Sequence, residues 1–243
     1  DSYGFMWIST HGGGLVRDDG YKVTSFGYTA SPIALRSNSC RNVSEDRFHR
    51  LWIAFEEGPQ VLDLETMRPV TPSCTNSAIA EHLHRVLDRA CIRTYCDSKG
   101  CIWITTTTEI LRIAFDEVGK VNSILSIPIS TAVPEFGMCD VYGRGSVVVC
   151  NNGKVSEIAV RQGELVANDL SAMFAPLGTR YAGSIIRYNN KIWLATNDGL
   201  FCSDGRQFYS YDSCHTLQHN VATCLAVSPE NRLLVGTLCG VDI

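Results

Sequence analysis

Histidines and carboxylates are the side chains of this chain that most readily carry acid–base or metal chemistry. The 243 residues include six histidines and 25 acidic residues, but no spacing among them defines a catalytic triad, a paired acid and base, or a set of metal ligands. His82 and His84 are two residues apart, so they cannot share a helical face as a metal pair. We therefore expect no catalytic residue, no metal site and no cofactor, although groups far apart in the sequence can still converge in the folded chain.

A second set of side chains has the chemistry of sugar recognition. Planar aromatic rings cover the apolar face of a sugar, and amide, carboxylate, imidazole and guanidinium groups bind its hydroxyls. Residues of these types lie in short segments between apolar runs: His11, Glu56, Asn152, Arg180, Tyr181, Asn197, Asp198 and Tyr211. They form the candidate ligand-binding site, although ordinary solvated turns contain the same residue types.

The chain has eleven cysteines, an odd number, with no C-x-x-C pair among them. Cys91, Cys96 and Cys101 are spaced five residues apart, which is looser than zinc sites and small disulfide scaffolds require. We expect mostly buried, reduced cysteines that act as small apolar residues. One or two disulfides remain an alternative if the protein is exported.

Composition excludes several classes of protein. With 45% hydrophobic and 19% charged residues, the chain can bury a substantial core and is not of the disordered or fibrous type. A net charge of −4, with acids and bases interspersed, provides no basic stripe, so we expect no direct contact with nucleic acid. No stretch approaches the ~20 apolar residues that a membrane span needs.

The elements that must position the candidate residues are copies of one repeat. Its anchor is an apolar tetrad that begins with the chain's four tryptophans, at Trp7, Trp52, Trp103 and Trp193. Two degenerate copies begin at Val147 and Leu234. A residue suited to a tight turn stands three positions before most anchors: Gly4, His49, Gly100, Asn190 and Asn231. In three copies an aspartate opens this turn, where its side chain can accept hydrogen bonds from backbone N–H groups: Asp1, Asp46 and Asp97.

Short apolar strands surround each anchor, and four such strands per repeat predict an all-β fold, a β-propeller of four-stranded antiparallel blades. We expect residues 1–243 to form a single partial propeller domain of about five to six blades, cut mid-repeat at both ends. The count is three strands, then four complete blades, then two strands. Ile79, Leu83, Val86 and Leu87 predict a short amphipathic helix between two blades. The candidate ligand residues should lie on the face built by the loops after the second and fourth strands.

The repeat resembles that of the two-component regulator propeller family. The run Asp1–Leu15 reads DSYGFMWISTHGGGL and matches the family pattern almost throughout, and Asn190–Leu200, NKIWLATNDGL, is a second good match. The resemblance implies the ligand-sensing region of a hybrid two-component regulator. It also implies a periplasmic or extracellular location, an oligosaccharide ligand, a homodimeric parent protein, and a membrane helix, histidine kinase and DNA-binding output outside these residues.

Two other classes of function remain open. One is a propeller enzyme of the lyase type, which would bring a metal and a histidine acid together on one face. The other is a protein-interaction scaffold, which would expose a large apolar patch on one face.

Overall fold

The computed structural model describes residues 1–28, 33–129, 137–174, 177–212, 214 and 217–243. The chain divides into two compact units, Asp1–Ser130 and Thr131–Ile243, and each is described by itself. No helix among the described residues is both long and apolar enough to cross a membrane.

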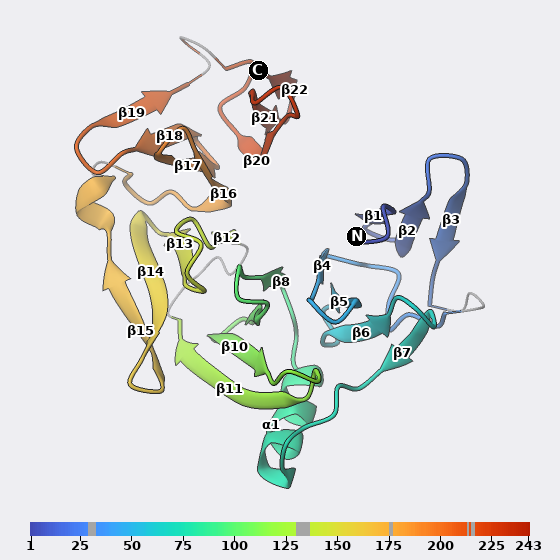
Figure 1. Cartoon of the computed structure of the whole chain (residues 1–243). Coiled ribbons are helices and arrows are strands. Elements are labelled where there is room, and N and C mark those ends of the chain that lie inside the picture. The colour runs from blue at the N-terminus through green and yellow to red at the C-terminus, as the bar shows by residue number, and fades with distance from the viewer. Residues whose placement is uncertain (29–32, 130–136, 175–176, 213, 215–216) are drawn as a thin grey trace. The chain divides into compact units, whose positions relative to one another are not determined.

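The first unit contains three antiparallel sheets and one helix (Figure 1). The sheets have the strand orders β1-β2-β3, β4-β5-β6-β7 and β8-β9-β10-β11. The elements are β1 (Met6–Ser9), β2 (Leu15–Asp18), β3 (Val23–Phe26), β4 (Asn42–Glu45), β5 (Arg50–Ala54), β6 (Gln60–Asp63), β7 (Arg68–Val70), α1 (Ser77–Leu87), β8 (Arg93–Cys96), β9 (Ile102–Thr105), β10 (Glu109–Phe115) and β11 (Val121–Pro128).

The second unit contains three further antiparallel sheets, ordered β12-β13-β14-β15, β16-β17-β18-β19 and β20-β21-β22. The elements are β12 (Met138–Cys139), β13 (Val147–Asn151), β14 (Lys154–Arg161), β15 (Glu164–Asp169), the short 3₁₀ helix η1 (Ser171–Met173), β16 (Ala182–Tyr188), β17 (Lys191–Thr196), β18 (Gly199–Ser203), β19 (Phe208–Tyr211), β20 (Ala222–Val227), β21 (Leu233–Thr237) and β22 (Gly240–Asp242).

The fold is a β-propeller, as the repeat predicts, and each anchor tetrad lies on the strand expected for it. The anchors fall on β1, β5, β9, β13, β17 and β21. The last sheet differs from the expectation of two strands, because β22 pairs with β21 through Val235↔Asp242 and its neighbours. The short run Gly240–Asp242 has too little apolar content to be identified as a strand without its pairing partner.

Alternate residues of an anchor strand pack against opposite neighbours, which explains the continuous apolar run. On β5, Leu51 and Ile53 join a cluster with Leu15 and Phe26 of the first sheet. Trp52 lies on the opposite face of β5, in a cluster with residues of the third sheet such as Ile102 and Ile104. A strand buried on both faces must be apolar at every position, whereas a strand exposed on one face alternates.

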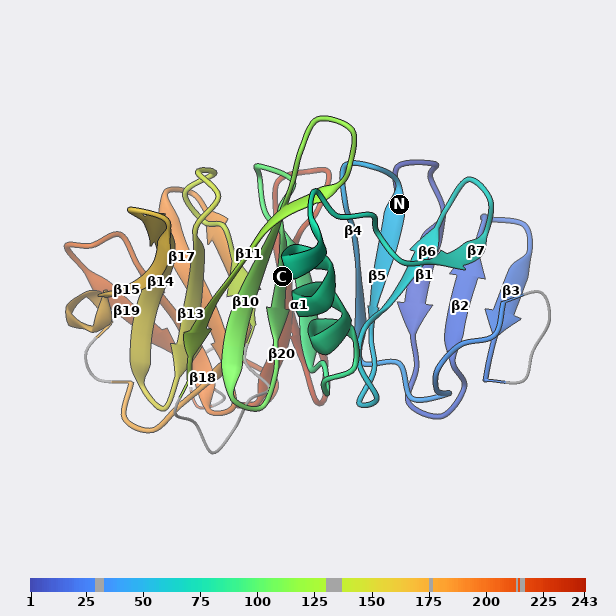
Figure 2. The same ribbon diagram turned by 90° about the horizontal axis from the view of Figure 1, so that it is seen from below.

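The inserted helix α1 forms where the apolar spacing predicts it. Asn76 is its N-cap, and the side-chain oxygen of this residue accepts a hydrogen bond from the backbone N–H of Ile79 at 2.9 Å. The helix buries Leu83, Val86 and Leu87 in the cluster between the second and third sheets. Figure 2 shows α1 lying across these sheets, beside β10 and β11.

All eleven cysteines are free thiols in the structure. Five are buried, as expected for small apolar residues: Cys40, Cys91, Cys101, Cys150 and Cys202. Three others are exposed, Cys214, Cys224 and Cys239. The expectation of burial therefore holds for these five, is met in part by the half-buried Cys74, Cys96 and Cys139, and fails for the three exposed thiols near the last sheet.

Candidate functional site

Aspartates of the first unit form a recurring clamp at the turn that leads into the anchor strand. In the second sheet, Asp46 Oδ1 accepts hydrogen bonds from the backbone N–H of Phe48 at 2.9 Å and of Arg50 at 3.2 Å. The other carboxylate oxygen, Oδ2, accepts from the indole N–H of Trp52 at 2.8 Å and from Nε of Arg50 at 2.8 Å. One buried carboxylate thus fixes both the turn and the tryptophan six residues later.

The third sheet repeats this arrangement. Asp97 Oδ1 accepts from the backbone N–H of Lys99 at 2.8 Å and of Cys101 at 3.0 Å, and Oδ2 accepts from the indole of Trp103 at 2.8 Å. Arg112 Nε lies 3.6 Å from Oδ2, close enough for an ion pair but too far for a hydrogen bond. The predicted role of the aspartates in the turn is confirmed, and the bond to the tryptophan is an addition that spacing alone does not reveal.

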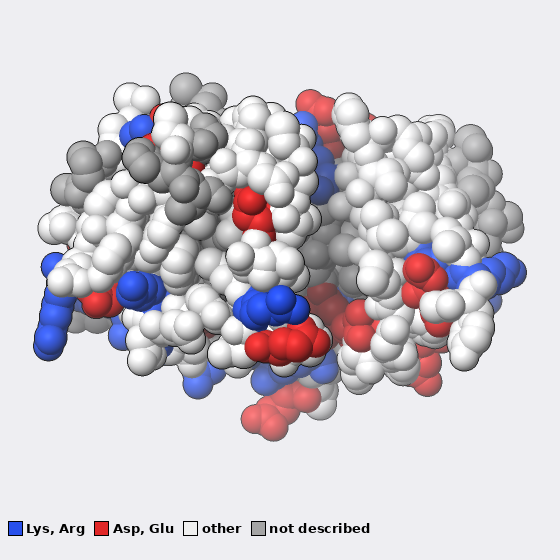
Figure 3. Space-filling view, turned by 90° about the horizontal axis from the view of Figure 1, so that it is seen from above, with Lys and Arg blue, Asp and Glu red and all other residues white. Residues whose placement is uncertain are grey.

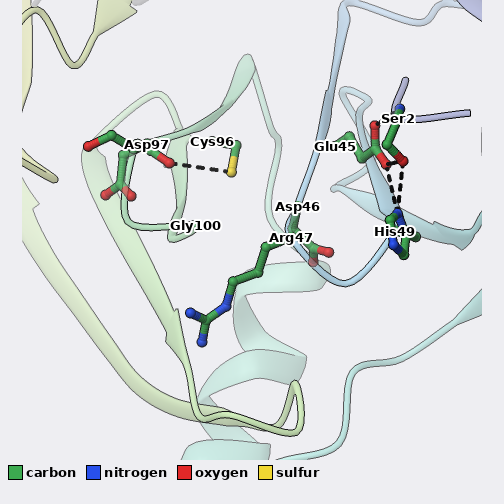
Figure 4. Close-up of a pocket in the computed structure, with 9 residues that line it drawn as sticks. Ser2, Glu45, Asp46, Arg47, His49, Cys96, Asp97 and Gly100 are labelled. Carbon is green, nitrogen blue, oxygen red and sulfur yellow. Dashed lines mark hydrogen bonds and ion pairs between the residues drawn. The ribbon is translucent and has the colours of Figure 1, made fainter. Parts of the chain in front are cut away.

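A hollow of about 370 Å³ lies at these turns (Figure 4). Its walls come from the turn before β5 and the turn before β9, with one residue from the turn before β1. The lining residues are Ser2, Glu45, Asp46, Arg47, His49, Cys96, Asp97, Ser98 and Gly100. The hollow is therefore at the edge of the sheets formed by turns between first and second strands, opposite the edge on which ligand binding is predicted.

One cluster in the hollow has the residue types of a nucleophilic triad: Ser2, Glu45 and His49. Ser2 Oγ donates to Glu45 Oε1 at 2.5 Å and lies 2.8 Å from His49 Nδ1, while Nδ1 is 3.4 Å from the same Glu45 oxygen (Figure 4). In a nucleophilic triad the imidazole contacts the hydroxyl through one nitrogen and the carboxylate through the other. Here a single nitrogen faces both groups, so the imidazole cannot pass a proton from serine to the opposite side of its ring. The arrangement is a hydrogen-bonded junction between two sheets.

The ionisation of the lining groups agrees with a structural role. Burial raises the pKa of Glu45, but hydrogen bonds from Ser2 and from His49 outweigh it, and the net effect holds this pKa below its ordinary value. Burial, together with the nearby carboxylates Asp97 and Asp46, raises the pKa of the Cys96 thiol to about 12. A thiol with such a pKa stays protonated near neutral pH and is a poor nucleophile or metal ligand.

The carboxylates of the hollow have little capacity left for a cation. The oxygens of Asp46 and Asp97 already accept from backbone, indole or arginine donors, and Glu45 Oε2 accepts from the backbone N–H of Ser2 at 2.7 Å. Across the described ranges, no group of three or more His, Cys, Asp or Glu side chains is placed to hold a metal ion. The polar lining stabilises the turns rather than presenting open ligand-binding groups.

Several predicted ligand residues come together in the second unit, around two hairpin turns. Arg180 donates from Nε to the carbonyl oxygen of Asp198 at 2.8 Å and from a terminal nitrogen to Asp198 Oδ2 at 2.6 Å. The backbone N–H of Tyr181 donates to Asn197 Oδ1 at 3.0 Å. Beside Asn152, the N–H of Gly153 donates to the carbonyl oxygen of Arg180 at 2.6 Å. We call this group, Asn152, Arg180, Tyr181, Asn197 and Asp198, the rim cluster.

The positions of the rim cluster follow from the hairpins. Asn152 has a φ of 51°, a left-handed conformation that asparagine tolerates, and so its identity is set partly by the turn. Gly153 approaches the backbone of the segment between sheets so closely that a Cβ there would overlap the carbonyl oxygen of Gly178. Asn197 and Asp198 are exposed, and they retain capacity for a ligand beyond the contacts to Tyr181 and Arg180.

The other predicted ligand residues lie outside the rim cluster: Tyr211, His11 and Glu56. Tyr211 stacks on Trp193 with ring centroids 5.7 Å apart and an interplanar angle of 21°, so its ring is part of the packing. In the first unit, His11 Nδ1 lies 2.6 Å from Ser39 Oγ, and Glu56 lies 3.8 Å from Arg41. Both are on exposed segments that follow an anchor strand, as predicted. Whether any of these residues contacts a ligand stays a prediction.

The hollow contains residues that were not singled out as a site from the sequence. Asp46 and Asp97 were recognisable in the sequence from their fixed distance before a tryptophan, but this spacing predicted a turn rather than a binding site. Glu45 and Ser2 had no such spacing, because they meet only when neighbouring sheets pack together.

On the face in Figure 3, acidic and basic side chains are scattered among uncharged ones.

Comparison with known proteins gives likeness of fold. No family model matches the chain, and no curated protein matches it significantly. Among solved structures, it is similar to the extracellular domain of a hybrid two component system from B. thetaiotaomicron, with 14% identity and a TM-score of 0.60 over 100% of this chain and 37% of that one. The chain thus spans little more than a third of that domain.

Two other similar structures are of other proteins. YCF48 from Cyanidioschyzon merolae has 11% identity and a TM-score of 0.64, covering 97% of this chain and 77% of its own. A gluconolactonase from Xanthomonas campestris has 12% identity and a TM-score of 0.55, covering 93% of this chain and 80% of its own. At such identities the likeness establishes the β-propeller fold, and the function must be argued from the site.

Proposed function

We propose that this chain is a ligand-sensing propeller segment of a hybrid two-component regulator, on the periplasmic or extracellular side of the membrane. The observation that carries the proposal is the repeat itself, with its Asp–Trp clamp in successive blades, in a fold that matches part of such an extracellular domain over the whole length of this chain. The membrane helix, histidine kinase and DNA-binding output belong to the parent protein. The parent acts as a homodimer.

The ligand in this proposal is an oligosaccharide, and the rim cluster is its contact on this chain. Arg180 is held rigidly, because its guanidinium also donates to the carbonyl oxygen of Leu177 at 3.0 Å. The exposed Asn197 accepts from the backbone N–H of Tyr181, and the exposed Asp198 follows it in the chain, so both lie beside the half-buried Tyr181. A flat ring next to fixed amide and carboxylate groups is suited to a sugar, whose face is apolar and whose edge carries hydroxyls.

A sugar-binding role can be tested by calorimetric titration of the full chain, and of its complete extracellular region, with a panel of oligosaccharides. Asn197→Asp keeps the oxygen that accepts from the backbone of Tyr181 but removes the amide donor, and Tyr181→Phe removes only a hydroxyl. Each should weaken binding by ~1–3 kcal/mol, the cost of an unpaired polar group. Asn189→Asp, in an exposed turn at the other end of the same hairpin, is the matched control and should leave affinity unchanged.

Failure of every sugar to bind the complete region would contradict the proposed ligand, and equal effects of Asn197→Asp and Asn189→Asp would contradict the proposed location of the site.

The second candidate function is a propeller enzyme, which the fold shared with a gluconolactonase supports. Metal-dependent turnover of a lactone or glycoside by the chain would favour that candidate over the sensor. The scaffold alternative has no specific observation in its favour.

A further inference from the structure

Arg180 is the side chain of the rim cluster that could bind an acidic sugar, and its hydrogen bonds are already committed. Nε donates to the carbonyl oxygen of Asp198 at 2.8 Å, and the two terminal nitrogens donate to Asp198 Oδ2 at 2.6 Å and to the carbonyl oxygen of Leu177 at 3.0 Å. The guanidinium carbon lies 5.2 Å from the centroid of the buried Phe201 ring. Arginine recognises an anion best through two parallel N–H groups, and here Nε and one terminal nitrogen both point at Asp198. An anionic ligand would therefore compete with Asp198 for this side chain.

The charges around the rim cluster are compensated or negative. Arg180 is the only lysine or arginine among the described residues of the loops after the second and fourth strands of the second unit, and it is paired with Asp198. Lys154, the first residue of β14, is the next cation along this edge, and Asp169 lies within its electrostatic reach. Asp212 follows β19 at the same edge and adds an acidic group. Each described cation at this edge therefore has a carboxylate near it, and no excess of positive charge is present there for an acidic sugar.

The groups that remain open are one hydrogen-bond donor and one acceptor on consecutive residues. Asn197 Oδ1 accepts from the backbone N–H of Tyr181 at 3.0 Å, so the amide nitrogen of Asn197 is the part of this exposed side chain that can still bond. The side chain of Asp198 is 50% exposed, and its Oδ1 lies 3.4 Å from the Asn220 amide. A carboxylate oxygen can accept more than one hydrogen bond, so this long contact leaves room for a second donor.

Sugar hydroxyls match this pair of groups, whereas acidic groups do not. A hydroxyl both donates and accepts, so one hydroxyl of a neighbouring pair can donate to Asp198 Oδ1 while the other accepts from the Asn197 amide. A carboxylate or sulfate only accepts hydrogen bonds, so it cannot replace the hydroxyl at Asp198. It would also bring a negative charge next to the Asp198 carboxylate, and like charges that meet at a contact oppose binding.

We propose that the rim cluster selects uncharged glycans and rejects glycans that carry carboxylate or sulfate groups. This inference rests on the proposed sugar-binding function and adds the class of sugar. Asn197 and Asp198 contact a pair of neighbouring hydroxyls, and Arg180 holds Asp198 in place while its own charge is used within the protein. The open carboxylate oxygen supplies the selectivity, because it favours a hydroxyl and opposes an acid at the same position.

The test measures the affinity of the full chain for paired oligosaccharides by isothermal titration calorimetry. Short gluco-, manno- and galacto-oligosaccharides are each compared with the derivative whose C6 hydroxyls are oxidised to carboxylates, so the two members of a pair share linkage and length. At low ionic strength the neutral member should bind more tightly, by about tenfold or more. The difference should narrow at high salt, because salt screens exposed charges.

Two matched substitutions locate the selectivity. Asp198→Asn keeps the size of the side chain and an oxygen for Arg180 but removes the negative charge, so the oxidised sugars should lose most of their disadvantage of about tenfold. Asp204→Asn makes the same change in an exposed turn at the opposite end of β18, where Asp204 Oδ1 accepts from the backbone N–H of Arg206 at 2.8 Å. This control should leave both affinities unchanged. Thermal unfolding followed by circular dichroism checks that both variants are folded.

The outcomes separate this inference from the proposed function. Tight binding of neutral members and weak binding of oxidised ones, relieved by Asp198→Asn and not by Asp204→Asn, supports the inference. Equal or tighter binding of the oxidised members, or a preference that Asp198→Asn leaves unchanged, would refute the selection of uncharged glycans while sugar sensing itself still stood. Binding of neither member of any pair would contradict the proposed sugar-sensing function, and this inference with it.

Discussion

Replacing Asp97 by alanine should be among the most damaging single substitutions at a turn of this protein. Asp97 is buried, and its carboxylate accepts three hydrogen bonds, from two backbone N–H groups and the Trp103 indole, at 2.8–3.0 Å. The backbone N–H of Lys99 is half-buried and can bond to water instead, at a cost of about 1 kcal/mol, but the buried N–H of Cys101 cannot. The buried indole N–H cannot either, and the nearby Arg112 loses its counter-charge. We expect a total loss of about 3–5 kcal/mol.

Asp116→Ala is the matched control, because Asp116 caps an exposed turn with the same two types of backbone bond but contacts no indole. Its Oδ1 accepts from Val118 at 3.0 Å and Lys120 at 2.8 Å. We expect a loss of about 1 kcal/mol there. Urea unfolding followed by far-UV circular dichroism would measure both variants, and a double-mutant cycle with Trp103→Phe would isolate the indole bond. If Asp97→Ala cost no more than Asp116→Ala, the clamp would have no special role in stability.

Three further predictions test other parts of the fold. Trp103→Ala should lower the free energy of unfolding by ~3–5 kcal/mol, because the ring is fully buried. Trp7→Ala should lower it clearly less, because Trp7 is only half-buried. Equal losses for the two variants in chemical denaturation would contradict the packing described. Gly153→Ala should destabilise by more than 2 kcal/mol, because its Cβ would overlap a backbone carbonyl, while Gly163→Ala, also at positive φ but with open space around it, should cost about 1 kcal/mol. Burial raises the pKa of Glu157, but hydrogen bonds from an arginine and a serine outweigh it and lower this pKa below its ordinary value. The stabilisation of the folded state by ionised Glu157 is therefore complete above the unfolded pKa of about 4.3, and it is lost as pH falls through the lower folded pKa. Glu157→Gln should remove this dependence and flatten the acid limb of a plot of melting temperature against pH.

The fold was predictable because its signal is repeated and is placed at buried positions. The ring of Trp52 fills the space between two sheets, so this position admits few residue types and stays visible in the sequence. The turn residues were equally informative, since His49, Asn190 and Asn231 all have positive φ, as a tight hairpin requires. The strand Gly240–Asp242 was missed because its pairing comes from a partner strand rather than from its own composition.

The site was less predictable, because its contacts join residues from separate turns and, between Gly153 and Arg180, from separate sheets. Arg180 and Asp198 could be placed on the same edge of the sheets from the repeat, but nothing in the sequence indicates that they bond to each other. The junction of Ser2 with Glu45 arises in the same way, from the packing of one turn against the next. The repeat predicts where each turn lies within its own blade, and the packing of blades decides which turns touch.

A carboxylate's role in this protein depends on how many donors already occupy its oxygens. Asp97 is enclosed by backbone and indole donors, with the Arg112 guanidinium close by, so a ligand would have to displace bonds that hold the turn together. Asp198 has one oxygen bonded to Arg180, while the other lies 3.4 Å from the Asn220 amide, and its side chain is half-exposed. A hydroxyl of a sugar can bond to this second oxygen without breaking the pair with Arg180. Open hydrogen-bonding capacity on a rigid support is what a binding site needs, and this difference favours the rim cluster over the hollow as the place where a ligand would bind.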